Sequence, residues 1–229
     1  METSTIKKQF GVLWLNKSGF DLHILGSQQP FRHPFTTDII SYLEVLDESK
    51  LETDIKLFVE QNKIPSSFLV MVLSQDVLFE NEFVETTPEQ MKETELQFID
   101  TVPFENIYSK IWKVGNKPRL VAVNADLFST LKIAFEKVGI SMEIAIPYFV
   151  TGVNAISVEL TNMLFKKYEV LKNESIVESH LNFENEQVKP ESLVPVKRSK
   201  REFVLIGIFI LLMLVLFLVV YWQFFRKTA

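Results

Sequence analysis

The hydrophobic pattern is most pronounced near the end of the chain, at residues 203–225. This stretch, FVLIGIFILLMLVLFLVVYWQFF, carries one glycine, one glutamine and no charged residue. At about 1.5 Å of rise per residue, a helix of this length covers the roughly 30 Å hydrocarbon core of a bilayer. A helix buried in a small soluble core would keep a polar stripe, and this stretch has none. The pattern therefore predicts a transmembrane helix.

The residues that flank the predicted span indicate its orientation. More basic residues precede it than follow it, and positive residues stay on the cytoplasmic side of a membrane. We therefore expect a single-pass protein whose N-terminal part is cytoplasmic. The basic cluster would either bind anionic lipid headgroups or only set this topology. The predicted anchor residues are Phe203, Leu211, Leu218, Tyr221 and Trp222, and the juxtamembrane basic residues are Lys197, Arg198, Lys200 and Arg201.

In the N-terminal part, short apolar runs alternate with segments of helical periodicity, which predicts a mixed α/β domain. Two pairs of strands are separated by turn residues, at 16–19 and 115–118, and are expected to form hairpins. Residues 26–46 show no clear pattern. The predicted strands are 9–15, 20–25, 67–73, 77–84, 107–114, 119–123 and 140–146, and the predicted helices are about 50–62, 87–100, 125–138 and 151–171.

Three of these helices have recognisable capping residues. Ser49 is followed three positions later by Glu52, which is the spacing of a capping box. Thr87 precedes a proline and has a glutamine three positions on, which also favours a helix start. Asn124 can cap the third helix through its side-chain oxygen. We expect these residues to set the amino ends of their helices.

The composition excludes several classes of function. The net charge is -5 at pH 7 although a basic cluster precedes the predicted anchor, so the remainder of the chain is acidic. A nucleic-acid-binding surface needs a basic face, and none is evident. The chain has no cysteine, which excludes disulfides and thiolate metal sites. After residue 172 the apolar periodicity fades, and residues 173–202 are predicted to be a flexible linker to the membrane.

No combination of residues indicates a catalytic or metal site. His23, His33 and His180 lack the spacing of metal ligands. The nucleophile motif G-x-S-x-G and the phosphate-binding motifs G-x-G-x-x-G and G-x-x-x-x-G-K-[ST] do not occur. We therefore expect no enzyme activity, no cofactor, no metal and no small-molecule substrate.

An acidic strip remains open to more than one interpretation. Glu80, Glu82 and Glu85 alternate with apolar residues in a predicted strand. They form a general-acid pair, an acidic docking strip or the solvent-facing side of an ordinary strand. If the strand lies at a sheet edge, it could accept a partner's strand.

Five segments, taken in chain order, resemble one known group of proteins. They are FGVLWLNKSGFDLHIL, FLVMVLSQDVLFENEFV, FIDTVPFENIY, RLVAVNADLFSTLKIAFEKVGI and AIPYFVTG. Their order and spacing resemble the actin-like proteins of type IV pilus and type II secretion platforms, of the PilM type. The resemblance implies a half actin-like (RNase H-like) lobe over residues 1–172, with a small inserted α/β subdomain at 77–148.

The chain departs from the nucleotide-binding members of that group at its first turn. Those members have an Asp and glycines whose backbone N–H groups approach phosphate, whereas this chain has Leu15, Asn16, Lys17, Ser18 and Gly19. The resemblance also implies a second lobe after the first, where this sequence continues into the predicted linker. We therefore expect no nucleotide site unless another chain supplies the second lobe.

The resemblance implies a non-enzymatic scaffold at an inner-membrane platform. Its expected partners are membrane lipid and either other platform proteins or further copies of itself. Two alternatives remain: a nucleotide-dependent ATPase completed by a second chain, and a tail-anchored adaptor unrelated to pili.

Overall fold

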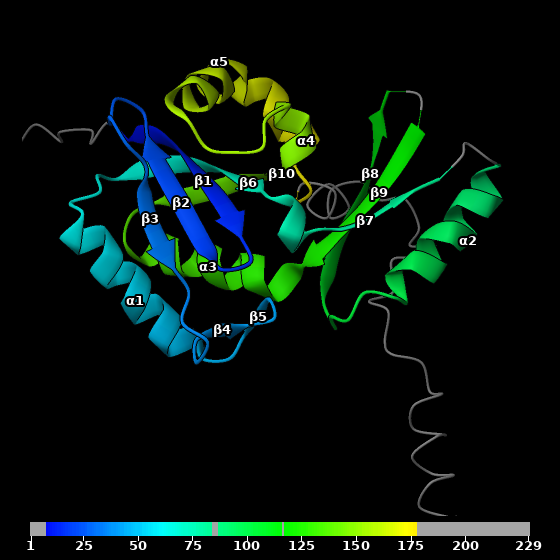
Figure 1. The fold of residues 1–229 in the computed structure, drawn as a ribbon, viewed down its shortest axis with the longest axis horizontal. Coiled ribbons are helices and arrows are strands. Elements are labelled where there is room, and N and C mark those ends of the chain that lie inside the picture. Colours follow the sequence, from blue (N-terminus) through cyan, green and yellow to red (C-terminus); the bar gives the residue numbers. More distant parts are fainter. Residues whose placement is uncertain (1–7, 84–86, 116, 178–229) are drawn as a thin grey trace, which may run out of the picture. The chain divides into compact units, whose positions relative to one another are not determined.

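The computed structural model describes residues 8–83, 87–115 and 117–177 (Figure 1). The strands are β1 Gln9–Asn16, β2 Gly19–Ile24, β3 Phe31–Pro34, β4 Ile40–Ser41, β5 Glu44–Val45, β6 Ser67–Leu73, β7 Phe79–Glu82, β8 Ile107–Val114, β9 Lys117–Asn124 and β10 Ser141–Pro147. The helices are α1 Glu48–Gln61, the short 3-10 helix η1 Gln75–Val77, α2 Pro88–Ile99, α3 Ala125–Lys137, α4 Tyr148–Thr151 and α5 Val158–Glu174. The mixed α/β class predicted from the sequence is confirmed.

The main sheet has five strands in the order β10-β6-β1-β2-β3. The first three strands of the chain form an antiparallel meander, and β6 and β10 run parallel to β1. The predicted first hairpin is confirmed, with Asn16 paired to Gly19 across its turn. The predicted strand at 67–73 is confirmed as β6, which lies between β1 and β10. A strand in this position is buried on both faces, which explains its uninterrupted apolar sequence.

Helices cover both faces of the main sheet (Figure 1). The helices α1 and α3 lie on one face and α5 on the other. Successive side chains of a strand point to opposite faces, so β1 contributes to two cores. Leu13 and Leu15 pack with α1 and α3, whereas Val12 and Trp14 pack under α5. This division makes the apolar run of β1 continuous rather than alternating.

A second sheet of three strands, in the order β7-β9-β8, is inserted after β6. Its β8–β9 hairpin confirms the second predicted hairpin, with Val114 paired to Lys117. The inserted part comprises residues 79–124, which is shorter than the 77–148 expected from the resemblance. The difference arises because Leu131 and Phe135 of α3 are buried in the core shared with α1, and β10 joins the main sheet.

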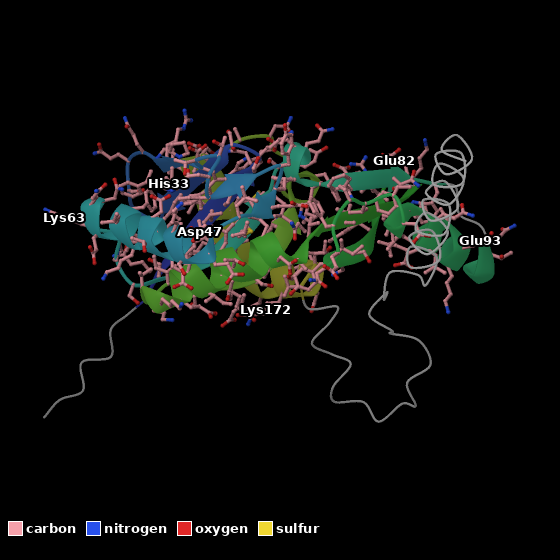
Figure 2. All side chains as sticks on the ribbon, turned by 90° about the horizontal axis from the view of Figure 1, so that it is seen from below. His33, Asp47, Lys63, Glu82, Glu93 and Lys172 are labelled. Atoms are coloured by element: carbon pink, nitrogen blue, oxygen red, sulfur yellow. The ribbon has the colours of Figure 1, made fainter. Side chains whose placement is uncertain are left out.

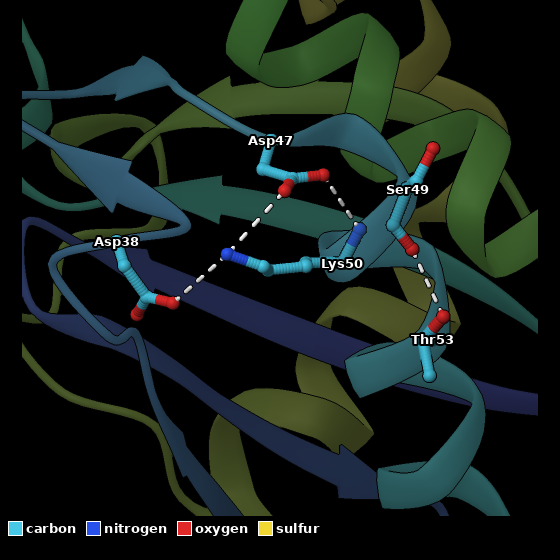
Figure 3. A network of polar contacts seen from close by, with 5 residues as sticks. All are labelled: Asp38, Asp47, Ser49, Lys50 and Thr53. Atoms are coloured by element: carbon cyan, nitrogen blue, oxygen red, sulfur yellow. Dashed lines mark hydrogen bonds and ion pairs between the residues drawn. The ribbon is translucent and has the colours of Figure 1, made fainter.

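The first helix begins one residue earlier than its expected cap. Asp47, not Ser49, is the N-cap of α1, and its carboxylate accepts a hydrogen bond from the Lys50 N–H at 3.0 Å (Figure 3). That bond is the main cause of a lowered pKa of Asp47. The Lys50 ammonium also pairs with Asp38 and Asp47, at 3.4 Å each. Ser49 lies inside the helix, where its carbonyl accepts a bond from Thr53.

The predicted caps of α2 and α3 are confirmed. Thr87 and Gln90 form a reciprocal capping box, and a proline occupies the first turn of α2. The Asn124 side chain accepts the N–H groups of Asp126 and Leu127 at the start of α3. Each motif satisfies N–H groups that have no partner inside the helix.

The single helix predicted at 151–171 is wrong, because the chain forms two helices there. Gly152 ends α4 in a left-handed conformation with φ of 74°. The chain then continues irregularly until Ser157, whose side chain accepts the Leu160 N–H and starts α5. The apolar spacing predicted one continuous helix because Val153 fits the helical stripe, although its side chain is exposed.

The ordered domain continues past the predicted linker start at residue 173. The helix α5 extends to Glu174, and residues 175–177 run along the edge strand β10. The Ile176 N–H donates to the Ala145 carbonyl at 2.8 Å, and the Ala145 N–H donates to Ser175 Oγ at 3.1 Å. Ile176 is fully buried. This segment therefore belongs to the fold.

Two other stretches differ from prediction. The patternless region contains the edge strand β3 and the short β4–β5 hairpin, and the strand expected at 77–84 is limited to Phe79–Glu82. Short edge strands with exposed residues leave little hydrophobic pattern. The predicted membrane span, the basic cluster and most of the predicted linker lie outside the described residues. Within residues 8–177, apart from the two gaps, no helix is long and apolar enough to cross a bilayer.

Candidate functional site

The carboxyl ends of β1, β6 and β10 meet at one edge of the main sheet. In open α/β sheets, ligands bind at this edge, beyond the carboxyl ends of the parallel strands. Here β1 ends at Asn16, β6 is followed by Ser74 and η1, and β10 ends at Pro147 before α4. These turns form the candidate functional site.

The Asp76 carboxylate, which belongs to η1, closes the β1–β2 turn. The Lys17 N–H donates to Asp76 Oδ2 at 2.9 Å, and the Ser74 hydroxyl bonds to the other oxygen of Asp76. The Ser18 N–H and hydroxyl both donate to Asn16 Oδ1, at 2.9 and 2.8 Å. Two backbone N–H groups of the turn are therefore already hydrogen-bonded. The Lys17 N–H binds Asp76 of η1, and the Ser18 N–H binds Asn16 of the turn itself.

This hydrogen bonding disfavours a phosphate at the turn. An anion bound by a turn needs free backbone N–H groups and a positive local potential. At this turn the Lys17 and Ser18 N–H groups are engaged, and the Asp76 carboxylate places negative charge where an anion would approach. Among the described residues, no group of three or more His, Asp or Glu side chains could hold a metal ion.

The β4–β5 hairpin beside this edge has a strained turn. Tyr42 and Leu43 have φ of 51° and 68°, a left-handed region that disfavours residues with a Cβ. Leu43 is buried, and its carbonyl accepts a bond from Asn124 Nδ2 at 2.9 Å. Tyr42 is 83% exposed, and Lys17 Nζ lies 5.9 Å from the centre of its ring. Asn124 thus joins the hairpin to the cap of α3.

A second polar cluster lies on the three-stranded sheet. Arg119 on β9 forms ion pairs with two glutamates of the edge strand β7, with Glu80 at 3.1 Å and with Glu82. Glu82 is labelled in Figure 2. The Arg119 guanidinium lies 4.8 Å from the ring centre of Phe149 on α4. Trp112, the cross-strand partner of Arg119, contacts the same phenylalanine ring. The cluster therefore joins the inserted sheet to α4.

Burial is the largest single influence on Glu80 and Arg119, but it decides the direction of the pKa shift only for Glu80. Burial raises the pKa of Glu80, and the positive charge of Arg119 offsets this only in part. Burial lowers the pKa of Arg119, but the hydrogen bond to Glu82 and the two carboxylate charges outweigh it, so the net pKa is raised. Glu80 Oε1, Arg119 Nε and Trp112 Nε1 are buried without a hydrogen-bond partner among the described residues.

The acidic strip therefore divides in two. Glu80 is 18% exposed and packs in the cluster, while Glu82 is 46% exposed and fits the solvent-facing interpretation better. Glu85 lies outside the described residues. The strand β7 does lie at a sheet edge, as the docking hypothesis requires.

Two of the three histidines pack within the fold. His23 is fully buried, with Nδ1 2.8 Å from Thr161 Oγ1 and Nε2 3.1 Å from the Ser27 carbonyl. His33 Nε2 lies 2.9 Å from Asp54 Oδ2. Both contacts link a strand to a neighbouring element, β2 to α5 and β3 to α1. His180 lies outside the described residues.

Comparison with known proteins gives weak likenesses only. No family model and no curated protein matches the sequence. Among solved structures, the PilM-PilN type IV pilus biogenesis complex matches at 14% identity and a TM-score of 0.40, over 58% of this chain and 45% of that one. The cytoplasmic domain of EpsL, an inner membrane component of the type II secretion system of Vibrio cholerae, matches at 11% identity and a TM-score of 0.38, over 61% and 57%.

A Bacteroides thetaiotaomicron protein with an actin-like ATPase fold and unknown function matches at 14% identity and a TM-score of 0.38, over 62% of this chain and 54% of that one. The chain thus spans about half the length of these three structures. Because all three TM-scores are below 0.5, the strand order of the main sheet is the firmer description of the fold.

The residues assigned to the membrane lie outside the described part, so their roles stay predictions. The Glu80–Arg119 pair was not predicted from the sequence, because the two residues lie 39 positions apart on different strands. The turn at Tyr42 was not predicted either, because left-handed turns are normally signalled by glycine or asparagine. The available signal for the ion pair was that Glu80 and Glu82 point to one side of a strand, while Arg119 lies on another strand that can pair with it.

Proposed function

We propose that this protein is a non-enzymatic scaffold, in which a half actin-like lobe binds partner proteins while residues 203–225 hold it at a membrane. The observation that carries the proposal is the β1–β2 turn, whose N–H groups are engaged by Asp76 and Asn16. A turn occupied in this way favours binding by contact over phosphate chemistry.

The half-lobe assignment is supported by the main sheet. An antiparallel meander of three strands, extended by two parallel strands in the order β3-β2-β1-β6-β10, has the arrangement expected of an actin-like (RNase H-like) lobe. The inserted sheet follows β6, within the region where the sequence resemblance places an insertion. The pilus or secretion setting rests on that sequence resemblance.

The anchor would act by local concentration. Proteins tethered to the same membrane have a higher effective concentration for one another, so their association becomes nearly intramolecular. Its partners in this proposal are membrane lipid and platform proteins or further copies of the chain, with the N-terminal domain in the cytoplasm.

Membrane fractionation tests the anchor. We expect the full chain to stay in the membrane pellet after an alkaline carbonate wash. Leu211→Arg/Leu218→Arg should release most of it, because each arginine near a span centre costs about 2.5–3.5 kcal/mol of insertion free energy. The matched control, Leu46→Arg/Leu57→Arg on exposed leucines of the lobe, should stay in the pellet. Full release of the unmodified chain would contradict the anchor.

Nucleotide titration tests the non-enzymatic assignment. The full chain, in detergent micelles with magnesium and fluorescent ATP, is expected to show no saturable binding by anisotropy. Asp76→Ser, which frees the Lys17 N–H, provides the matched comparison. Saturable binding by the unmodified chain would instead support the ATPase alternative, and it would not depend on the outcome of the fractionation.

A further inference from the structure

An apolar groove lies along α5, beside the amino ends of β1 and β6. Its volume is about 260 Å³, and its apolar lining comes from Phe68, Phe165, Tyr168 and Val170. Pockets for small-molecule ligands are commonly about 300–1,000 Å³. The groove is therefore suited to one or two inserted side chains rather than to a cofactor.

Aromatic rings form the wall of this groove. The Phe10 ring centre is 5.3 Å from those of Phe68 and Phe165, and Tyr168 is 5.2 Å from Phe68. These rings are held by two paired strands and a helix, so little order has to be gained on binding. Phe165 is nevertheless 48% exposed and Val170 is 64% exposed. Exposed apolar side chains gathered beside a concavity mark an interaction site.

The charges around the groove are mainly positive. Lys166 and Lys167 line it, and neither has an ion pair among the described residues. The acidic lining residue, Glu169, is paired with Lys172 at 3.0 Å, and this hydrogen bond is the main cause of a raised pKa of Lys172. An incoming acidic group would meet uncompensated lysines.

We propose that this groove binds an acidic segment of a partner protein, which inserts a phenylalanine or leucine side chain between Phe68 and Phe165. Glutamate or aspartate residues on either side of the inserted group would pair with Lys166 and Lys167. The apolar anchor supplies most of the affinity, and the charges supply partner choice and association rate. This inference rests on the proposed scaffold function and names the chemistry of one partner.

Three short fluorescent peptides test the proposal on the full chain in detergent micelles. The first contains glutamate and serine around one central phenylalanine, the second replaces each glutamate with lysine, and the third replaces the phenylalanine with serine. We expect the first peptide to bind at least about tenfold more tightly than either of the others, which corresponds to about 1.4 kcal/mol. Equal binding of the acidic and basic peptides would overturn the proposal.

Variants of the chain place the binding at the groove. Lys166→Glu/Lys167→Glu should weaken binding of the acidic peptide at least about tenfold, and Phe165→Asp should abolish it. Ile133→Asp on α3 is the matched control, since Ile133 is also 48% exposed, and it should bind like the unmodified chain. Circular dichroism checks that each variant is folded. Unchanged affinity in the lysine variant would overturn the proposal.

One further variant distinguishes a partner from the chain itself. Residues 178–186 contain Leu181 and Phe183 among glutamates. If the acidic peptide binds only after Leu181→Ser/Phe183→Ser, the groove belongs to this segment and the partner proposal is overturned. None of these outcomes alters the nucleotide titration, which reports on the opposite, carboxyl ends of β1 and β6.

Discussion

Replacement of Phe20 by alanine is expected to lower the free energy of unfolding by about 3–5 kcal/mol, the usual cost of removing a buried phenylalanine. Phe20 is 1% exposed and lies on β2. Its ring centre is 5.2 Å from that of Phe58 on α1, 5.6 Å from Phe135 on α3 and 4.9 Å from His33 on β3. One side chain thus joins two helices to two strands, and the resulting cavity could not be filled by small movements.

Urea denaturation followed by circular dichroism measures this loss. Leu46→Ala provides the control, because Leu46 is an exposed residue of the same lobe and its truncation should change the stability by less than about 0.5 kcal/mol. A loss below about 1 kcal/mol for Phe20→Ala would show that the aromatic core is packed differently from this description.

Replacement of Arg119 by methionine is expected to cost about 2–4 kcal/mol of unfolding free energy at neutral pH. Methionine keeps much of the packing against Phe149 but leaves Glu80 and Glu82 without their cation. Removing one partner of a buried ion pair is strongly destabilising because the other charge stays buried. The expected range starts below the about 3–5 kcal/mol typical of fully buried pairs, since both side chains of the Arg119–Glu80 pair retain some solvent contact.

The pH dependence of this loss identifies its cause. Burial raises the pKa of Glu80 in the folded state, so protonated Glu80 is tolerated better there than in the unfolded chain. The stability from this group is present below its unfolded pKa and is lost as pH rises through its folded pKa. The loss caused by Arg119→Met should therefore shrink on acidification toward the ordinary glutamate range. Arg119→Met/Glu80→Gln should recover stability at neutral pH, and failure to do so would contradict a charge-based explanation.

The sequence pattern predicted elements whose signals are local. The strand β6 is an uninterrupted apolar run because it is covered on both faces, and the α3 helix combines a capping Asn124, an apolar stripe and a terminal glycine in one continuous segment. For such elements, propensity, capping and burial all indicate the same structure. Their bounds were therefore predicted within one or two residues.

Features that depend on distant contacts were not predictable in this way. The left-handed turn at Tyr42 is held by Asn124, which donates to the Leu43 carbonyl and lies 81 positions further along the chain. Arg119 has no local partner, and its role emerges only when β9 pairs with β7. The break between α4 and α5 was hidden because Val153 continued the apolar spacing. At the candidate site, the residues of the β1–β2 turn were identified from the sequence, but the contribution of Asp76 was not.

The hydrogen bonds between Ala145 and residues 175–176 limit how this domain can be shortened. A soluble fragment cut at the boundary suggested by the fading periodicity would lose the segment that shields the outer side of β10. The bare backbone of that strand would then be available to a second molecule, and edges of this kind promote aggregation. A truncation intended for biochemical work should therefore retain the chain through Val177, whatever it removes beyond that point.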